Sequence, residues 1–335
     1  MSKPVKNCCF LSLITLFFVL FINCPAFAVT IDITQSNCPQ GMVLIPEGSF
    51  KMGSDNSDFV EERSAENVTV TPFCIDKYEV TNAQFAKFVQ ATGYVTVAER
   101  PLSKEQFPNL PDEQRLPGSL VFQMAKSGTK QVSFLSWWYW TPGANWQHPF
   151  GPDSAIATKS QYPVVHIAYE DAAAYAKWAE KSLPTEAQWE YAARGGLDGA
   201  TYAWGDQYSE KKANTWQGIF PFFNTQADGY VGTAPIGSFP PNGYGLYDMT
   251  GNVWELTSDW FGLGHNSKAH RINPTGPKES FDPNKATEIA LHVIKGGSYL
   301  CAPNYCSRFR PAARESQTPD TGTTHIGFRL VKNLS

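Results

Sequence analysis

The sequence has no run of lysine or arginine, and its 335 residues carry a net charge of -4 with a pI near 5.9. Binding to nucleic acid or to anionic lipid needs concentrated positive charge, so we expect neither as a partner. The sequence also lacks a G-x-S-x-G nucleophile elbow, an H-E-x-x-H zinc motif, a Walker lysine loop and an EF-hand loop. These absences argue against several common classes of hydrolase, nucleotidase and calcium sensor.

Glycine and proline, by contrast, are abundant, with 26 and 24 residues. Both weaken regular structure, so long loops and short elements should dominate. A hydrophobic content of 42% and an aromatic content of 14% are enough to bury a large core. No composition break or linker divides residues 29–335, which predicts one domain.

Residues 1–28 have the pattern of a secretory signal peptide. Two lysines supply a positive start, an apolar run follows from Cys8 to Ile22, and Ala26-Phe27-Ala28 is a small-x-small cleavage site. The alternative is an uncleaved membrane anchor, but a membrane-spanning helix needs about 20 apolar residues and this run is short. We therefore expect cleavage, a secreted or periplasmic location, and no stable membrane insertion afterwards.

Three of the seven cysteines would leave with the signal, which keeps Cys38, Cys74, Cys301 and Cys306. An exported chain matures in an oxidising compartment, where disulfides form. Cys38 and Cys74 flank the first predicted strands, and we assign them to a structural disulfide. That assignment leaves Cys301 and Cys306 as a local pair.

The local pair can cooperate only across a turn. Residues five apart lie about 140° apart around an α-helix and on opposite faces of a strand. Pro303 presets φ for the second position of a β-turn, and Asn304 tolerates the third. Ala302 to Tyr305 can therefore fold the chain back and bring the two sulfur atoms close.

Several kinds of chemistry suit such a pair. A structural disulfide is the simplest. Two thiolates also suit Cu(I), whereas structural Zn²⁺ and iron–sulfur clusters need more protein ligands than one pair supplies. Thiol–disulfide exchange fits less well, because C-x-x-C spacing at a helix N-terminus is absent. The residues by themselves leave the disulfide and the copper site open.

Sequence patterns predict short strands and three helices. Thr81 and Thr185 are the expected N-caps of two helices, each with a glutamine three residues on to complete a capping box and a glycine, at 93 or 195, as the stop. The other predicted elements are a hairpin over residues 41–52 with its turn at Pro46-Glu47-Gly48, an alternating strand over 68–75, a strand over 163–169 and an alanine-rich helix over 170–179. Residues 101–163 lack periodicity, and regular structure should thin out again after Tyr202.

Two features of the middle of the chain have both a structural and a functional interpretation. Aromatic residues are concentrated at Trp137, Trp138, Tyr139, Trp140 and Trp146. Such residues can pack a loop-rich core or form the wall of a binding site. From the residues alone we favour the structural interpretation, in which these side chains pack a core. His166 lies in an apolar segment, where a lone histidine is more often a hydrogen-bonded core residue than a ligand.

Asparagine and acidic residues punctuate the loops after Tyr202, at Asn214, Asp228, Asp248, Asn252 and Glu255. Carboxylate and backbone oxygens in such loops can wrap a hard cation such as Ca²⁺. The same residue types form Asx turns, and their spacing alone favours the turns.

Motifs spread over most of the chain carry a family resemblance. They are Gly41 to Gly53 (GMVLIPEGSFKMG), Tyr78 to Asn82 (YEVTN), Leu183 to Tyr191 (LPTEAQWEY), Asn242 to Tyr247 (NGYGLY), Gly251 to Glu255 (GNVWE) and Gly327 to Arg329 (GFR). From about residue 38 to 332 the chain resembles the sulfatase-modifying, formylglycine-generating enzyme family, and its bacterial members best. Most of these motifs belong to the whole superfamily, so they specify the fold better than the activity.

The segment around the paired cysteines resembles the active-site segment of true formylglycine-generating enzymes. It runs from Gly296 (GGSYLC) to Cys306 and continues through Arg308-Phe-Arg310 to Arg314. Two further segments, Gly93 to Glu99 (GYVTVAE) and Gly143 to Pro149 (GANWQHP), resemble that branch too.

The resemblance implies a single-domain, loop-rich α+β fold of the formylglycine-generating-enzyme type, a variant of the C-type-lectin fold. It implies an oxidase that uses O₂ and a thiol reductant to convert a cysteine to Cα-formylglycine, within a Cys-x-Pro-x-Arg segment of an unfolded type I sulfatase. By position, Cys301 and Cys306 would bind Cu(I). Trp254, Ser298 and Tyr305 would line the pocket for O₂ and the substrate thiol.

The resemblance also implies two Ca²⁺ sites. One would use Asn214 and Asp228 with the carbonyls of Thr215 and Tyr230. The other would use Asp248 and Glu255 with the carbonyls of Gly251 and Val253.

Four residues depart from the vertebrate enzymes of this family. Pro311 and Leu330 stand where cysteines occur there, His325 stands in place of an asparagine, and Asp248 replaces an asparagine as a cation ligand, which adds charge to that site. A competing hypothesis remains, in which the chain is a non-catalytic binding domain. Cys301 and Cys306 would then form a structural disulfide, and the aromatic loops would bind peptide or glycan.

Overall fold

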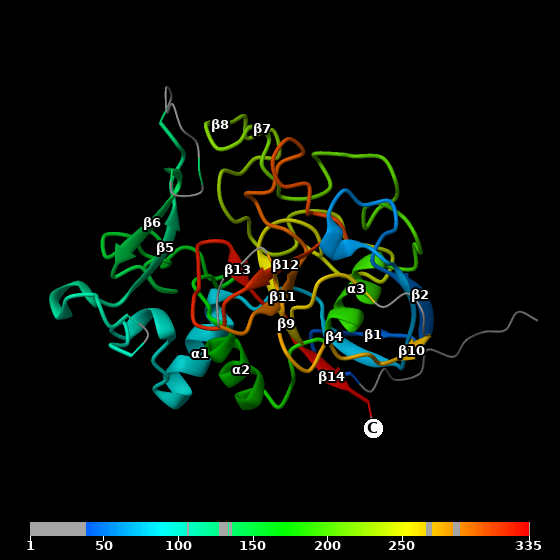
Figure 1. The fold of residues 1–335 in the computed structure, drawn as a ribbon, viewed down its shortest axis with the longest axis horizontal. Helices are drawn as coiled ribbons and strands as arrows, with labels where there is room; N and C mark the ends of the chain where they lie inside the picture. Colours follow the sequence, from blue (N-terminus) through cyan, green and yellow to red (C-terminus); the bar gives the residue numbers. More distant parts are fainter. Residues whose placement is uncertain are drawn as a thin grey trace, which may run out of the picture. The chain divides into compact units, whose positions relative to one another are not determined.

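Short strands and three α-helices make up most of the regular structure in the part of the chain that is described (Figure 1). The computed structural model describes residues 38–105, 107–126, 133, 136–265, 270–283 and 289–334. The predicted signal peptide therefore lies outside the described residues. The residues that the structure describes belong to one compact unit, and no helix among them has the length and apolar character to cross a membrane. The loop-rich α+β architecture that the sequence predicts is confirmed.

The helices are α1 (Asn82–Thr92), α2 (Tyr169–Trp178) and α3 (Glu186–Arg194), with short 3-10 turns at Val60–Glu62, Val97–Glu99 and Asp112–Gln114. Both predicted capping boxes are present. Thr81 and Gln84 exchange hydrogen bonds between side chain and backbone N–H of 3.3 and 2.8 Å, and α3 repeats the arrangement. Gly93 and Gly195 end the two helices in the left-handed conformation, with φ of 66° and 57°.

The first sheet joins segments from both ends of the described chain. Its order is β1 (Met42–Ile45), β4 (Phe73–Asp76) and β14 (Val331–Asn333), and both pairings are antiparallel. A disulfide between Cys38 and Cys74 links the segment before β1 to β4. The predicted Cys38–Cys74 bridge is therefore confirmed.

The predicted hairpin over residues 41–52 is wrong. β1 pairs with β4, whereas β2 (Gly48–Met52) pairs with β3 (Glu66–Val70) in a second sheet, to which β10 (Arg271–Ile272) adds in parallel. Gly48, expected in the turn, lies in β2 against Tyr191, where a Cβ would stand 2.0 Å from the tyrosine hydroxyl oxygen. Close packing against α3, and not a turn, requires glycine at this position.

Two other predicted strands differ from the structure. The strand over residues 68–75 divides into β3 and β4, because Pro72 between them has no N–H to donate. Residues 163–169 do not form a strand, although the N–H of His166 bonds the carbonyl of Thr323 at 2.9 Å. His166 has a φ of 61°, and a left-handed residue interrupts strand pairing. The predicted helix that follows begins one residue earlier, at Tyr169.

A four-stranded sheet leads into the segment of the paired cysteines. Its order is β12 (Arg314–Gln317), β11 (His292–Lys295), β9 (Trp254–Trp260) and β13 (Ile326–Gly327), with only β13 and β9 parallel. We did not predict these strands, because β11 is buried on both faces and therefore shows no alternation. Two separate hairpins, β5 (Gly118–Phe122) with β6 (Trp138–Pro142) and β7 (Gly218–Ile219) with β8 (Phe223–Asn224), were also missed.

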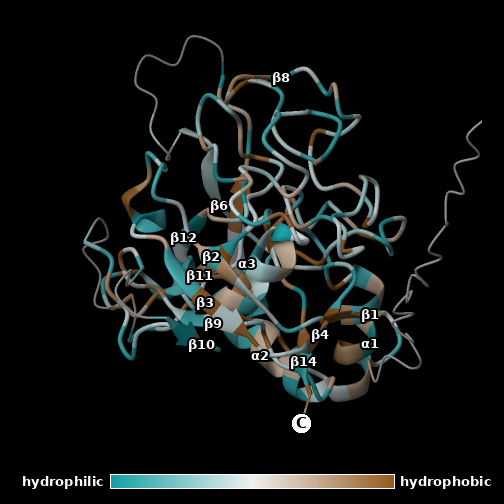
Figure 2. Cartoon of the chain, turned by 90° about the vertical axis from the view of Figure 1, so that its right-hand side faces the viewer, coloured by the Kyte–Doolittle hydropathy of each residue, from teal (hydrophilic) through white to brown (hydrophobic). Residues whose placement is uncertain are grey.

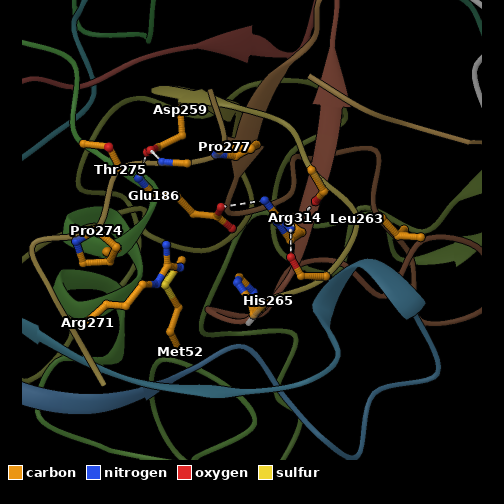
Figure 3. Close-up of a pocket in the computed structure, with 14 residues that line it drawn as sticks. Met52, Glu186, Asp259, Leu263, His265, Arg271, Pro274, Thr275, Pro277 and Arg314 are labelled. Carbon is orange, nitrogen blue, oxygen red and sulfur yellow. Dashed lines mark hydrogen bonds and ion pairs between the residues drawn. The ribbon is translucent and has the colours of Figure 1, made fainter. Parts of the chain in front are cut away.

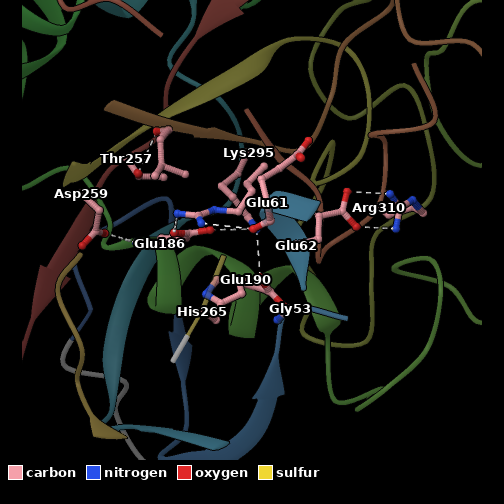
Figure 4. A network of polar contacts seen from close by, with 12 residues as sticks. Gly53, Glu61, Glu62, Glu186, Glu190, Thr257, Asp259, His265, Lys295 and Arg310 are labelled. Atoms are coloured by element: carbon pink, nitrogen blue, oxygen red, sulfur yellow. Dashed lines mark hydrogen bonds and ion pairs between the residues drawn. The ribbon is translucent and has the colours of Figure 1, made fainter. Parts of the chain in front are cut away.

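A buried ionic network joins α3 to the end of β11 (Figure 4). Lys295 is 0% exposed, and its Nζ lies 2.9 Å from Glu190 Oε2 and 3.5 Å from Glu186 Oε1. Arg194 and Arg314 each approach one of these carboxylates to 2.7 Å. Burial raises the pKa of Glu190, but Lys295 and Arg194 outweigh it and bring the value to about 2. The network therefore holds β11 against α3 with its charges compensated.

Two glycines turn the chain from β11 into the cysteine segment. Gly296 and Gly297 have φ of 92° and 71°. A Cβ at Gly297 would stand 2.9 Å from the Cα of Phe309, and one at Gly296 would stand 3.0 Å from the Trp189 ring. Residues with side chains would therefore be strained and crowded at both positions.

Candidate active site at the Cys301 and Cys306 thiols

The segment after Gly297 forms the turn that the sequence predicts. The N–H groups of Tyr305 and Cys306 donate to the carbonyl of Ala302 at 3.1 and 3.0 Å, and the N–H of Cys301 donates to the carbonyl of Ser298 at 2.9 Å. These bonds place the sulfur atoms of Cys301 and Cys306 2.7 Å apart, and both thiols are free. The turn therefore brings two unbonded thiols into contact.

The environment makes the two thiols unequal. Burial raises the pKa of Cys301 well above its usual value, and its contact with Cys306 raises it further. That contact lowers the pKa of Cys306, because the Cys306 sulfur accepts a hydrogen bond, and Arg308 nearby adds to the effect. Cys306 is therefore the thiol that ionises first.

The predicted pocket residues differ in burial and in the groups that they contact. Trp254 packs in the same buried cluster as Cys301, with Cys306 against it. Tyr305 is 52% exposed and stacks on Phe220 with ring centroids 4.2 Å apart. Ser298 is buried, and its hydroxyl oxygen accepts from the N–H of Leu300 at 3.2 Å. Trp254 and Tyr305 thus pack in different surroundings beside the two cysteines.

A shell of aromatic rings surrounds Phe220. Its ring lies 5.4 Å from Trp137, 5.2 Å from Trp216 and 5.8 Å from Phe122, measured between centroids. Trp137 also contacts Tyr305 at 5.7 Å. Of the crowded aromatic residues, Trp137 and Trp146 are buried, as we favoured, whereas Tyr139 and Trp140 are exposed. Through Trp137, the shell joins these aromatic residues to the segment from Ser298 to Cys306, which we call the thiol segment.

Of the two histidines that the sequence singled out, His166 is buried and His325 is half-buried. His166 is a core residue, as predicted: its ring nitrogens lie 2.8 Å from Ser119 Oγ and 2.8 Å from the carbonyl oxygen of Pro149. His325 stacks on Trp138, with centroids 4.8 Å apart, and its Nδ1 lies 3.0 Å from Thr323 Oγ1. Burial lowers the pKa of His166 to about 4 and that of His325 to about 3, so both are neutral near pH 7.

The first predicted calcium set comes together in space. The carboxylate of Asp228 accepts from the N–H groups of Thr215 and Tyr230 at 3.3 and 3.0 Å. Asn214 lies beside Thr215 in the chain and donates to the carbonyl of Gly232 at 2.9 Å. The four predicted residues therefore belong to one loop cluster.

The second predicted set contains a carboxylate that sequence reasoning missed. Glu79 is buried, and its Oε1 has no hydrogen-bond partner among the described residues. Burial raises the pKa of Glu79 well above its usual value, and Asp248 and Glu255 raise it further. Arg329 is the cation of this cluster and contacts both Glu255 oxygens at 2.7 Å. One guanidinium therefore faces three carboxylates.

Asp248 shares this excess of negative charge. Its carboxylate accepts from the N–H of Gly237 at 2.6 Å, and burial raises its pKa to about 6. Within the described ranges, no group of three or more His, Cys, Asp or Glu side chains has the geometry of a metal cluster. Each predicted metal site uses only two side chains together with carbonyls or a substrate. The absence of a three-residue group among the described residues therefore counts neither for nor against the predicted sites.

A polar cavity of about 310 Å³ lies beside the ionic network (Figure 3). It shares no lining residue with the predicted pocket of the thiols, and its polar lining includes Glu186, Asp259, His265, Arg271 and Arg314. His265 Nε2 and Arg314 Nε have no partner in the described part of the chain. The cavity has the polar walls and the volume that suit buried water.

The fold and the thiol pair together define a class of protein: a loop-rich α+β domain with two free, adjacent cysteine thiols next to aromatic side chains. A family model described as "Sulfatase-modifying factor enzyme 1-like domain" matches residues 29–334. The chain is 52% identical over 298 residues to "Formylglycine-generating enzyme" of Mycobacterium tuberculosis, covering 87% of this chain and 97% of that protein. It is 46% identical over 295 residues to the mouse protein of the same name, covering 87% and 74%. The chain belongs to the formylglycine-generating enzyme family, and it is an enzyme.

Other similar proteins show how widely the fold is used. Bovine "Inactive C-alpha-formylglycine-generating enzyme 2" is 36% identical over 294 residues, covering 87% of each chain. The solved structure of PvdO from Pseudomonas aeruginosa is similar with a TM-score of 0.60 and 26% identity, covering 88% of this chain and 94% of that one. The structure of CarF, at 20% identity and a TM-score of 0.50, is similar in fold alone.

Proposed function

We propose that this chain is a copper-dependent oxidase that converts the cysteine of a Cys-x-Pro-x-Arg segment to Cα-formylglycine with O₂, and so activates a type I sulfatase. The coarser statement, an enzyme that forms formylglycine for sulfatases, follows from the family. One observation carries the finer proposal: two free thiols with their sulfur atoms 2.7 Å apart.

Copper fits the residues that are present. Cys301 and Cys306 are soft sulfur ligands, they are not joined by a disulfide, and the lowered pKa of Cys306 favours the thiolate. Bound to these two sulfurs, Cu(I) would supply the one-electron chemistry that O₂ requires. The substrate thiol and O₂ would enter on the side lined by Trp254, Ser298 and Tyr305.

The reaction balances with a thiol reductant. The substrate's C–S bond breaks, a C=O bond forms, and the sulfur leaves as hydrogen sulfide. Oxidation of the substrate carbon and of the thiol reductant together supply the electrons that reduce O₂ to water. An unfolded substrate is required because the Cys-x-Pro-x-Arg segment must reach the thiols in an extended form.

Ca²⁺ would stabilise the loops around the site. Asn214, Thr215, Asp228 and Tyr230 would hold one ion, and Asp248, Gly251, Val253 and Glu255 would hold the other. The excess of carboxylate over guanidinium at the second set supports a cation there. Export as a secreted or periplasmic protein is part of the same proposal, and rests on the signal pattern of residues 1–28.

Purified protein, Cu(I), O₂, a thiol reductant and a Cys-x-Pro-x-Arg peptide test the proposal. Mass spectrometry should show the loss of mass that replaces –CH₂SH by –CHO, and a peptide with serine for cysteine should stay unchanged. Copper titration should show stoichiometric binding that Cys301→Ser and Cys306→Ser each abolish. Unchanged cysteine peptide at full copper loading would sink the proposal and favour a non-catalytic member of the family.

A further inference from the structure

The β7–β8 hairpin displays two apolar side chains to solvent. Ile219 and Phe223 are direct cross-strand partners and are 61% and 59% exposed. The N–H of Phe222 donates to the carbonyl of Ile219 at 2.8 Å, which closes the turn between the strands. Figure 2 shows hydrophobic colouring along the chain beside β8, at the periphery of the described residues. We call Ile219 and Phe223 the apolar pair.

The apolar pair stands on a firmly packed base. Phe220, between its two members, is buried in the aromatic shell. The indole N–H of Trp216 donates to the carbonyl of Phe223 at 3.1 Å, and the N–H of Ala125 donates to the carbonyl of Pro221 at 3.1 Å. These contacts hold the backbone of the hairpin, so the exposure of the apolar pair is not that of a loose loop.

The same base connects the hairpin to the thiols. Phe220 stacks on Tyr305 at 4.2 Å, and Tyr305 directly precedes Cys306. On the other side, the N–H of Trp216 donates to the carbonyl of Cys301 at 3.0 Å. The hairpin that carries the apolar pair therefore packs directly against Tyr305, the half-exposed residue that precedes Cys306. Figure 1 likewise shows β7 and β8 beside the orange loop that follows β11.

We propose that the apolar pair is a docking surface for the polypeptide substrate, and that it binds an apolar side chain on the flank of the oxidised cysteine. This inference rests on the proposed function, because it needs a polypeptide whose cysteine approaches Cys301 and Cys306. An unfolded chain exposes apolar side chains that its folded form buries, so the surface would favour the substrate before folding. A second copy of this chain is a poorer occupant, since stable dimers bury about 800 Å² on each partner and two side chains offer far less.

Peptides with a Cys-x-Pro-x-Arg core and a single leucine moved along either flank, compared with serine at the same position, test the inference. The wild-type enzyme should prefer leucine over serine at one position at least, through KM and not kcat. In the double variant Ile219→Thr and Phe223→Thr, which places a β-branched residue with good strand propensity at both positions, that preference should fall by about ten-fold, the effect of removing roughly one buried side chain's contact.

The matched control is Ile272→Thr, which changes an equally exposed side chain, 67% exposed, on the unrelated strand β10. It should keep the preference, and thermal unfolding should show that all variants are folded. The inference is overturned if wild type shows no leucine preference at any position, if the preference survives in the double variant, or if the apolar pair instead mediates dimers that the double variant abolishes. Failure of wild type to convert any peptide counts against the proposed function, not against the docking surface alone.

Discussion

The sulfur atoms of Cys301 and Cys306 lie 2.7 Å apart without a disulfide, held by a turn in which both Tyr305 and Cys306 donate to one carbonyl. Replacing either cysteine by serine should abolish turnover, because the proposed copper site has two sulfur ligands and none to spare. The fold should survive, since serine is smaller and the turn is made by backbone bonds. Peptide conversion and circular dichroism check both halves, and wild-type turnover by either variant would contradict the assignment.

The Cys38–Cys74 disulfide should matter for stability and not for chemistry. It closes a loop with a sequence separation of 36 residues, so replacing both cysteines by serine should cost about 4 kcal/mol of unfolding free energy. Turnover at a temperature where the variant is folded should match the wild type. Denaturant unfolding measures the first effect, and loss of copper binding in the folded double variant would show that this pair acts at the site.

Lys295 should be among the residues on which the fold depends most. Its charge is buried between Glu190 and Glu186, so Lys295→Met removes the cation that these carboxylates share and leaves each with one arginine, which should destabilise the protein by about 3 kcal/mol. Lys51→Met is the matched control: its pair with Asp55 is exposed and should be worth less than about 1 kcal/mol. Denaturant unfolding measures both losses. If the two variants lose the same free energy of unfolding, the buried network stabilises the fold no more than an exposed ion pair does.

Acid should destabilise the protein in part through His166. Burial lowers its pKa in the folded state to about 4, against 6.5 when exposed, so the unfolded chain binds the proton first as the pH falls. The contribution of His166 to the free energy of unfolding should therefore fall as the pH drops from 6.5 to 4, by about 3 kcal/mol at most. Buried carboxylates with raised pKa, such as Asp248, act with the opposite sign, so total stability does not isolate the histidine.

The variant His166→Asn isolates it, because asparagine tolerates the left-handed backbone at this position. The variant starts from lower stability near pH 7, since it loses the two ring hydrogen bonds. Its unfolding midpoint should nevertheless fall less steeply than that of the wild type as the pH drops from 6.5 to 4. If the unfolding midpoints of the variant and the wild type fall equally steeply with pH, His166 does not contribute to the loss of stability in acid.

Cation removal should reveal the charge imbalance around Glu79. With chelator present, Glu79→Gln should raise the unfolding midpoint relative to wild type, because one buried carboxylate is gone. Added Ca²⁺ should stabilise wild type more than the variant. Thermal unfolding with and without Ca²⁺ checks both signs. If Ca²⁺ shifts neither protein, the second cation site is ruled out.

Some of the fold could be read directly from the residues. The capping boxes of α1 and α3, their glycine stops and the cysteine turn depend on groups within about four positions of one another, so local chemistry specifies them. The pairing of the strands could not be read in this way. β1 and β2 adjoin in sequence, yet each pairs with a different distant strand, and the glycine expected in their turn serves instead to pack against Tyr191.

The sequence by itself determined the family, the loop-rich fold and the turn that makes Cys301 and Cys306 neighbours, because motifs and short-range hydrogen bonds carry that information. Only the tertiary structure decided that Glu79 meets Asp248 and Glu255 around one arginine, and that Phe220 links the thiol segment to an exposed apolar hairpin. The reason is physical: these contacts join residues far apart in the chain, and burial and ring packing fix them only once the whole core has formed.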